Sequence, residues 1–140
     1  MKKIFIIFLV SFFLATCYYY IRHPIGEKAI INGHTIRLEL AVTEAEKEKG
    51  LGERDTLASD SGMLFVYDHP ERYGFWMKGM RFPLDFIWIN GNTVADLTQN
   101  VSTGAPAFAP LVPADKVLEV NTGVIDQLSI KIGDLVHFSN

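Results

Sequence analysis

The sequence predicts an α+β domain that is mainly β: a barrel-like sheet of short strands with two short helices, preceded by an N-terminal membrane helix. Three observations carry this prediction: an uncharged apolar run near the N-terminus, short apolar or alternating segments separated by Gly, Pro and Asn turns, and only two short helical patterns. A chain of 140 residues has room for one domain and an appendage. We therefore divide it into a signal-anchor or transmembrane segment (1–21), a linker (22–28) and one mainly-β domain (29–140).

Residues 4–21 predict a transmembrane helix. These 18 residues carry no charge, and a helix of that length spans about 27 Å, close to the thickness of the hydrocarbon core. Lys2 and Lys3 precede the run and a tyrosine triplet at 18–20 closes it, a pattern that favours a cytoplasmic N-terminus. We therefore expect the membrane as a partner, through residues 4–21, and the body outside the cytoplasm.

Two interpretations with cleavage stay open for this segment. One is a secretory signal cut near Ala15, and the other is a lipoprotein signal that presents Cys17 for lipidation. Both also place the body on the periplasmic or extracellular face. Cys17 is the only cysteine, so the body contains neither a disulfide nor a thiol nucleophile.

Charge and motif content exclude several classes of partner. Beyond Lys2 and Lys3, 11 basic residues face 16 acidic ones, a net charge of -5, which disfavours nucleic acid. The four histidines lack the spacing of metal ligands, and no phosphate-binding loop or nucleophile elbow is present. We therefore expect neither a metal nor another cofactor.

The first part of the body is expected to form a β-hairpin followed by a short helix. The Asn-Gly pair at 32–33 supplies the positive φ angles of a tight turn, and the alternating segment 35–42 follows it as a half-buried strand. Thr43 and Glu46 match a capping box, which predicts a helix of one or two turns that stops at Gly50.

The second part of the body is expected to contain further strands, a long loop and a second helix. Continuous apolar runs at 63–67 and 86–89 predict strands that are covered on both faces. Residues 100–114 hold three prolines and four alanines, which predicts a long surface loop and a candidate binding element. The remaining elements are a turn at 90–91, strands at 93–97 and 116–120, a helix at 124–128 and a final strand reached through 130–136.

Asp85 is the most informative candidate residue. On a strand it shares a face with Ile87 and Ile89, where an unpaired carboxylate would cost several kcal/mol. It therefore requires a cationic or backbone partner. The basic candidates for this partner are Lys78, Arg81 and Arg54.

Trp76 and Lys78 occupy one face of a short extended segment, with Phe75 and Met77 on the other. An aromatic floor beside an ammonium group suits an anionic or carbonyl-bearing small ligand. No residue is assigned a catalytic role. The candidate ligand-binding residues are Arg54, Trp76, Lys78 and Asp85.

Other interpretations of these residues stay open. In one, Asp85 and a basic partner form a structural latch while Trp76 packs in the core. In another, Lys78 or Asp85 acts as an acid or base in catalysis, which requires a perturbed pKa. Glu119 lies within the apolar strand 116–120; we expect it to face outward, with a second inward carboxylate as the alternative.

A series of short motifs through the body resembles a known family. They are, in order, Lys49-Gly50-Leu51, Arg54, Gly62-Met63-Leu64-Phe65-Val66, Phe75-Trp76-Met77-Lys78, Pro83-Leu84-Asp85, Leu118-Glu119-Val120, Gly123 and Ile132-Gly133-Asp134-Leu135-Val136. This order is similar to that of the domain of unknown function 192 (DUF192) family, over about residues 34–138. The resemblance implies a small prokaryotic protein with a β-rich fold, often secreted or membrane-anchored, and it implies no established activity. Gly52 and Gly79-Met80 stand where the family commonly has Met and Asn-Thr.

The function that we expect is that of an extracytoplasmic, membrane-anchored accessory domain. It would bind a small molecule, a peptide or an envelope component beneath the loop at 100–114. Two alternatives stay open: an envelope enzyme of hydrolase type that uses Lys78 and Asp85, which we favour less, and a structural module of a membrane complex.

Overall fold

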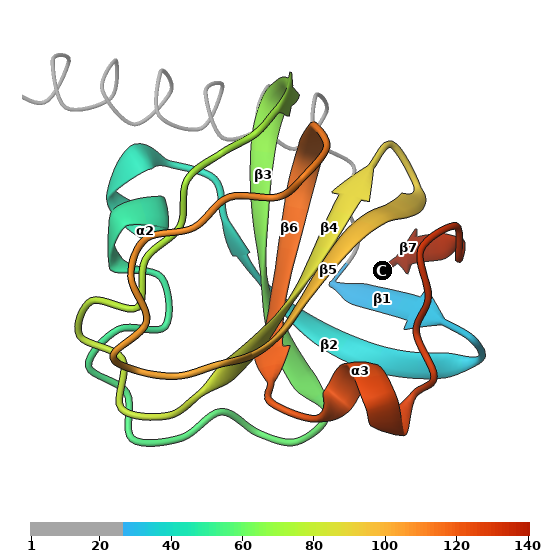
Figure 1. Ribbon diagram of the computed structural model, residues 1–140. Coiled ribbons are helices and arrows are strands. Elements are labelled where there is room, and N and C mark those ends of the chain that lie inside the picture. Colours follow the sequence, from blue (N-terminus) through green and yellow to red (C-terminus); the bar gives the residue numbers. More distant parts are fainter. Residues whose placement is uncertain (1–26) are drawn as a thin grey trace, which may run out of the picture.

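Seven strands form one strongly curved sheet in the computed structural model of the protein, which describes residues 27–140 (Figure 1). Their order across the sheet is β5-β4-β6-β3-β2-β1-β7. The strands are β1 (Lys28–Ile31), β2 (His34–Ala41), β3 (Ser61–Glu71), β4 (Leu84–Asn90), β5 (Thr93–Val101), β6 (Ala114–Asn121) and β7 (Val136–Ser139), and the helices are α2 (Glu44–Lys49) and α3 (Val124–Gln127). The mainly β fold with two short helices is confirmed for these residues, and its sheet is a half-barrel.

The predicted membrane helix at 4–21 and the fate of Cys17 lie outside the described residues. Within 27–140, neither helix has the length and apolar character that crossing a membrane requires. β1 begins at Lys28, one residue before the position at which we expected the domain to start.

Local sequence signals account for the first hairpin and for α2. Asn32 and Gly33 have positive φ angles of 52° and 79°, as the tight turn between β1 and β2 requires. The Thr43 hydroxyl accepts a hydrogen bond from the Glu46 amide, and the Glu46 carboxylate accepts one from the Thr43 amide. This capping box starts α2 where the sequence predicted it, and the helix ends at Gly50, whose φ of 48° favours glycine.

Backbone pairing curls the sheet into its half-barrel. All neighbouring strands are antiparallel except β2 and β3, which are parallel and are joined through α2. The Val94 amide donates to the Asp134 carbonyl at 2.9 Å, and the Gly133 amide donates to the Val94 carbonyl at 2.8 Å. These bonds connect β5 to the turn before β7, so the two edges of the sheet meet at one end.

β4 runs between two apolar clusters. Ile87 and Ile89 belong to the first cluster, which includes residues of β1, β2 and α3. Phe86 and Trp88 belong to the second cluster, to which the long connections between strands contribute. The alternation predicted along this strand is confirmed, and both of its faces are buried.

The predicted long loop is present as residues 102–113, between β5 and β6. Phe108 in this loop exchanges two backbone hydrogen bonds with Phe75, of 2.8 and 3.0 Å. The Phe108 ring also packs edge-on against Phe86, with 4.9 Å between the ring centroids. The loop is therefore fixed against both the sheet and the connection 72–83.

Asp85 is fully buried, and its partners are backbone amides instead of a basic side chain. Its Oδ1 accepts from the Asn100 amide at 2.8 Å and its Oδ2 accepts from the Ile125 amide at 3.1 Å. Arg81 pairs with Asp55. Of the two kinds of partner expected, cationic or backbone, the structure shows the backbone one, because the fold brings two amide donors from distant turns to this carboxylate. Asp85 thus holds the end of β5 and the start of α3 to β4.

We predict that Asp85→Ala lowers the free energy of unfolding by about 2–4 kcal/mol, because two buried amide donors lose their acceptor. Asp55→Ala is the matched control, since it removes an exposed ion pair and is expected to cost less than about 1 kcal/mol. Urea denaturation of both variants measures the difference. An equally large loss in Lys78→Ala would restore the latch interpretation and contradict the backbone role of Asp85.

Candidate functional site

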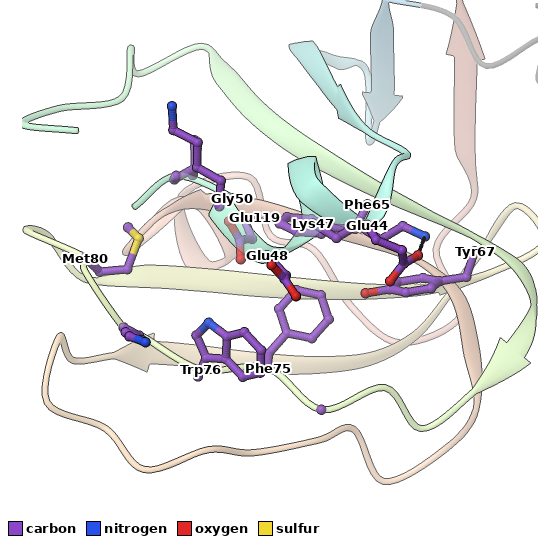
Figure 2. A pocket seen from close by; sticks show the side chains of 14 residues that line it. Glu44, Lys47, Glu48, Gly50, Phe65, Tyr67, Phe75, Trp76, Met80 and Glu119 are labelled. Atoms are coloured by element: carbon purple, nitrogen blue, oxygen red, sulfur yellow. Dashed lines mark hydrogen bonds and ion pairs between the residues drawn. The ribbon is translucent and has the colours of Figure 1, made fainter. Parts of the chain in front are cut away.

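A cleft of about 220 Å³ opens between α2 and the connection that leads into β4 (Figure 2). Glu44, Lys47 and Gly50 form one wall, from α2 and the turn that ends it. The opposite wall comes from residues 74–80, and β3 and Glu119 of β6 complete the lining. We refer to this cavity as the Glu119 cleft.

Glu119 is only 5% exposed, although we expected it to face outward. Its neighbours Leu118 and Val120 belong to the first core cluster. Glu119 therefore points to the other side of the sheet, between Phe86 on β4 and Met63 on β3. The expectation was wrong because the connections cover this side too, so β6 has no solvent-facing side at that position.

The Glu119 carboxyl lies in the lining of the cleft. Its Oε2 is buried and makes no hydrogen bond to any residue of the range 27–140. Burial alone raises the pKa of Glu119 to about 8, so the group is mostly protonated at neutral pH. A neutral carboxyl can donate one hydrogen bond and accept others. At Oε2, neither capacity is used by a described residue.

Phe75 positions the aromatic wall of the cleft. Its ring packs edge-on against Phe65 and Trp88, with centroid separations of 5.0 and 5.3 Å. Trp76 follows directly and points the other way, with 53% of its surface exposed. The interpretation of Trp76 as a core residue was therefore wrong. The predicted alternation is confirmed, since Phe75 and Met77 are buried while Trp76 and Lys78 are exposed.

Lys47 and Tyr67 form a second polar and aromatic wall. The Lys47 Nζ lies 4.3 Å from the centre of the Tyr67 ring and 3.3 Å from Glu44 Oε1. Tyr67 stacks on Tyr73, with ring centroids 3.6 Å apart. Burial raises the pKa of Tyr67 well above its ordinary value, so the phenol stays neutral. This wall therefore carries one ammonium group that is already paired with a carboxylate.

The structure brings two of the four expected ligand-binding residues to the cleft. Trp76 and Lys78 line it. Arg54 instead donates from both terminal nitrogens to the Glu39 carboxylate, each at 2.8 Å, and this pairing lowers the pKa of Glu39. Asp85 lies on the side of β4 that faces α3. Lys78 and Asp85 therefore belong to different sides of the fold.

Sequence reasoning assigned no site role to Lys47 and placed Glu119 outward. An acidic residue in the middle of the apolar strand 116–120 was the signal that pointed to a buried carboxyl. Lys47 had no such signal, because α2 is charged at five of its six positions (EAEKEK). Among residues 27–140, no group of His, Cys, Asp and Glu side chains is arranged to hold a metal ion.

Comparisons with other proteins agree with this fold. The DUF192 family, described as "Uncharacterized ACR", matches residues 27–138. A crystal structure of a protein of unknown function from Novosphingobium aromaticivorans DSM 12444 is 33% identical, with a TM-score of 0.74 over 79% of this chain and 84% of that chain. A protein from Sinorhizobium meliloti 1021, described as a candidate transcription regulator, is 30% identical, with a TM-score of 0.73 over 79% and 90%. No curated protein matches the chain.

We predict that Glu119 makes the protein less stable as the pH rises. The pKa of this carboxyl is about 8 in the folded protein and near the ordinary glutamate value of 4.5 in the unfolded chain. Between these values the folded state holds a proton that the unfolded chain has lost. The free energy of unfolding should therefore fall by up to about 1.4 kcal/mol for each pH unit in this window.

Glu119→Gln is the control for this titration, because its amide does not ionise. The free energy of unfolding of both proteins is measured by urea denaturation from about pH 5 to about pH 8. All other acidic groups titrate in both proteins, so their contributions cancel when the two free energies are subtracted. The stability of the wild type relative to Glu119→Gln is expected to decrease steadily across this range. If the difference in the free energy of unfolding between the two proteins stays constant across this pH range, the carboxyl is not held in its neutral form.

Proposed function

The chain belongs to the DUF192 family, and we propose that its domain binds a small ligand that places an uncharged polar group against the carboxyl of Glu119. One observation carries the proposal: a carboxyl that is buried in the lining of a cleft and lacks a protein partner at Oε2. A buried polar atom without a partner is destabilising, and native proteins retain few of them. A ligand that supplies the missing hydrogen bond accounts for its presence.

The neutral state of Glu119 selects the chemistry of the ligand. A protonated carboxyl donates to a carbonyl or hydroxyl oxygen, and its carbonyl oxygen accepts from a hydroxyl or an amide. A ligand carboxylate at this position would gain no countercharge and would itself lose hydration. Hydroxyl and amide groups therefore fit the buried end of the cleft, while Lys78 and Trp76 lie where they can contact the rest of the molecule.

Binding is favoured over hydrolysis with Lys78 and Asp85. Asp85 is engaged by two backbone amides and lies on the other side of β4 from the cleft, so it is not available to act with Lys78. A nucleophile needs an adjacent base to activate it, and Glu119 Oε2 makes no hydrogen bond to a described side chain. A role in transcription, as described for the Sinorhizobium meliloti relative, is not favoured at a net charge of -5 beyond residues 1–21, from 11 basic and 16 acidic residues.

The location of the domain is part of the same proposal. The apolar run at 4–21 supports a membrane anchor, and the flanking Lys2 and Lys3 support a domain outside the cytoplasm. A ligand of this domain would then be a small molecule or an envelope component of the periplasmic or extracellular side. A cleaved signal near Ala15 or a lipid on Cys17 would leave this assignment of compartment unchanged.

Two substitutions at Glu119 test the binding proposal. Glu119→Gln keeps a donor and an acceptor in the cleft, whereas Glu119→Leu removes both. NMR titration with neutral sugars and N-acetylated amino-acid amides is expected to shift the amide signals of Gly50 and Gly74. The affinity should stay within a few-fold in Glu119→Gln and fall about tenfold or more in Glu119→Leu.

Matching free carboxylic acids serve as the control ligands and are expected to bind less tightly than their neutral amides. The proposal is wrong if no neutral compound perturbs Gly50 and Gly74, or if Glu119→Leu binds as well as the wild type.

We also predict that Glu119→Leu stabilises the fold by about 1–3 kcal/mol near pH 8, because it removes the desolvation of an unpaired carboxyl. The urea midpoint of the variant measures this gain. It also shows that lost binding does not come from unfolding. A clear loss of stability would mean that Glu119 supports the core, contrary to the role assigned to it.

A further inference from the structure

A second hollow of about 650 Å³ adjoins the Glu119 cleft. It lies over the turn after α2 and over residues 76–79. Four residues line both cavities: Glu48, Lys49, Trp76 and Lys78. Glu119 lines the first cavity only. The two hollows therefore form one extended depression, which we name the Trp76 groove, with a buried carboxyl at one end and an open surface at the other.

We propose that the Trp76 groove binds an uncharged oligosaccharide, with a terminal sugar in the Glu119 cleft and the following sugar units along the open part. This inference rests on the proposed function and adds the class of ligand. The four residues that line both hollows support this inference. A ligand no larger than one sugar would leave the second hollow unoccupied. A chain of linked units can occupy both hollows at once.

Trp76 supplies a stacking surface in the middle of this path. More than half of its surface is exposed, at 53%. Its backbone is nevertheless fixed, because the preceding Phe75 is pinned to Phe108 by two hydrogen bonds. A pyranose ring presents an apolar face of C–H groups, which can pack on an indole that is held in place.

The charges of the groove favour a neutral, hydroxyl-rich chain. Its open part has two ammonium groups, on Lys49 and Lys78, and two carboxylates, on Glu48 and Glu53. Equal numbers of each sign attract neither a polyanion nor a polycation. Sugar hydroxyls can donate to the carboxylates and accept from the ammonium groups. The protonated Glu119 likewise suits a hydroxyl or an acetamido group.

The walls of the groove disfavour an extended peptide. Extended peptides bind most often by adding a strand to an open sheet edge. The edges of the described sheet are β5 and β7, whereas the groove is walled by α2, the turn after it and the connection before β4. Backbone pairing is therefore not available to a peptide here, and a sugar chain does not need it.

Binding of sugar chains of increasing length tests the inference on the full-length protein in detergent micelles. The probes are N-acetylglucosamine and its β-1,4-linked dimer, trimer and tetramer, the corresponding glucose oligomers, and N-acetyl-tetraalanine amide as the peptide. Calorimetry is expected to show an affinity gain of about tenfold or more from the single sugar to the trimer, for one of the two series. Trp76→Ala should remove that gain, so that the trimer binds no more tightly than the single sugar.

Tryptophan fluorescence gives a second readout, because the chain has only two tryptophans and Trp88 is fully buried. The trimer is expected to shift or quench the emission of Trp76. Arg37→Ala, which removes an exposed ion pair with Asp60 and lines neither cavity, is the matched control and should bind like the wild type.

The possible failures separate the two proposals. In one outcome a single sugar binds and Glu119→Leu abolishes its binding, but neither chain length nor Trp76→Ala changes the affinity. The oligosaccharide inference is then wrong and the binding function stands. If the peptide alone binds, or neither sugar series binds, the inference is also wrong. If binding is the same in Glu119→Leu as in the wild type, the proposed function fails as well.

Discussion

The pairing of Phe75 with Phe108 is the contact on which the candidate site depends. Two backbone hydrogen bonds join these residues, from connections 72–83 and 102–113 that would otherwise be long free loops. The Phe75 ring packs against Phe65, Phe86 and Trp88, so the contact is anchored in the second core cluster. Because Phe75 points inward, Trp76 must point outward. The exposed indole is therefore set by core packing, even though no regular helix or strand contains it.

The connection 72–83 and α2 form the walls of the cleft in which Glu119 lies. They cover the side of β6 that would face solvent in a simple open sheet, and a carboxyl on that side is removed from water without gaining a partner at Oε2. The protein compensates by holding the group neutral, since its pKa is raised to about 8. The site thus combines a stability penalty with an open hydrogen-bonding position, a combination that is common where proteins bind ligands.

Features determined by nearby residues were predictable from the sequence, whereas those set by distant contacts were not. The turn at Asn32-Gly33, the capping box of α2 and the alternation around Asp85 each depend on neighbouring residues, and all three are confirmed. The partners of Asp85 lie 15 and 40 residues away and are backbone amides, which leave no trace in residue identity. Burial of Glu119 likewise depends on how long connections fold over β6. Asp85 is therefore held by backbone amides away from the cleft, and Glu119 is the candidate site residue.

The protonation state of Glu119 tests the central claim most directly. A carboxyl-carbon NMR titration of the wild type, with the Glu119 signal identified by its absence from Glu119→Gln, measures the pKa of this one group. We expect a midpoint near the raised value of about 8 in the free protein, with a further rise when a neutral hydroxyl or amide ligand binds the protonated form. A midpoint near the ordinary 4.5, unchanged by any such ligand, would contradict the account of a buried neutral carboxyl that awaits a binding partner.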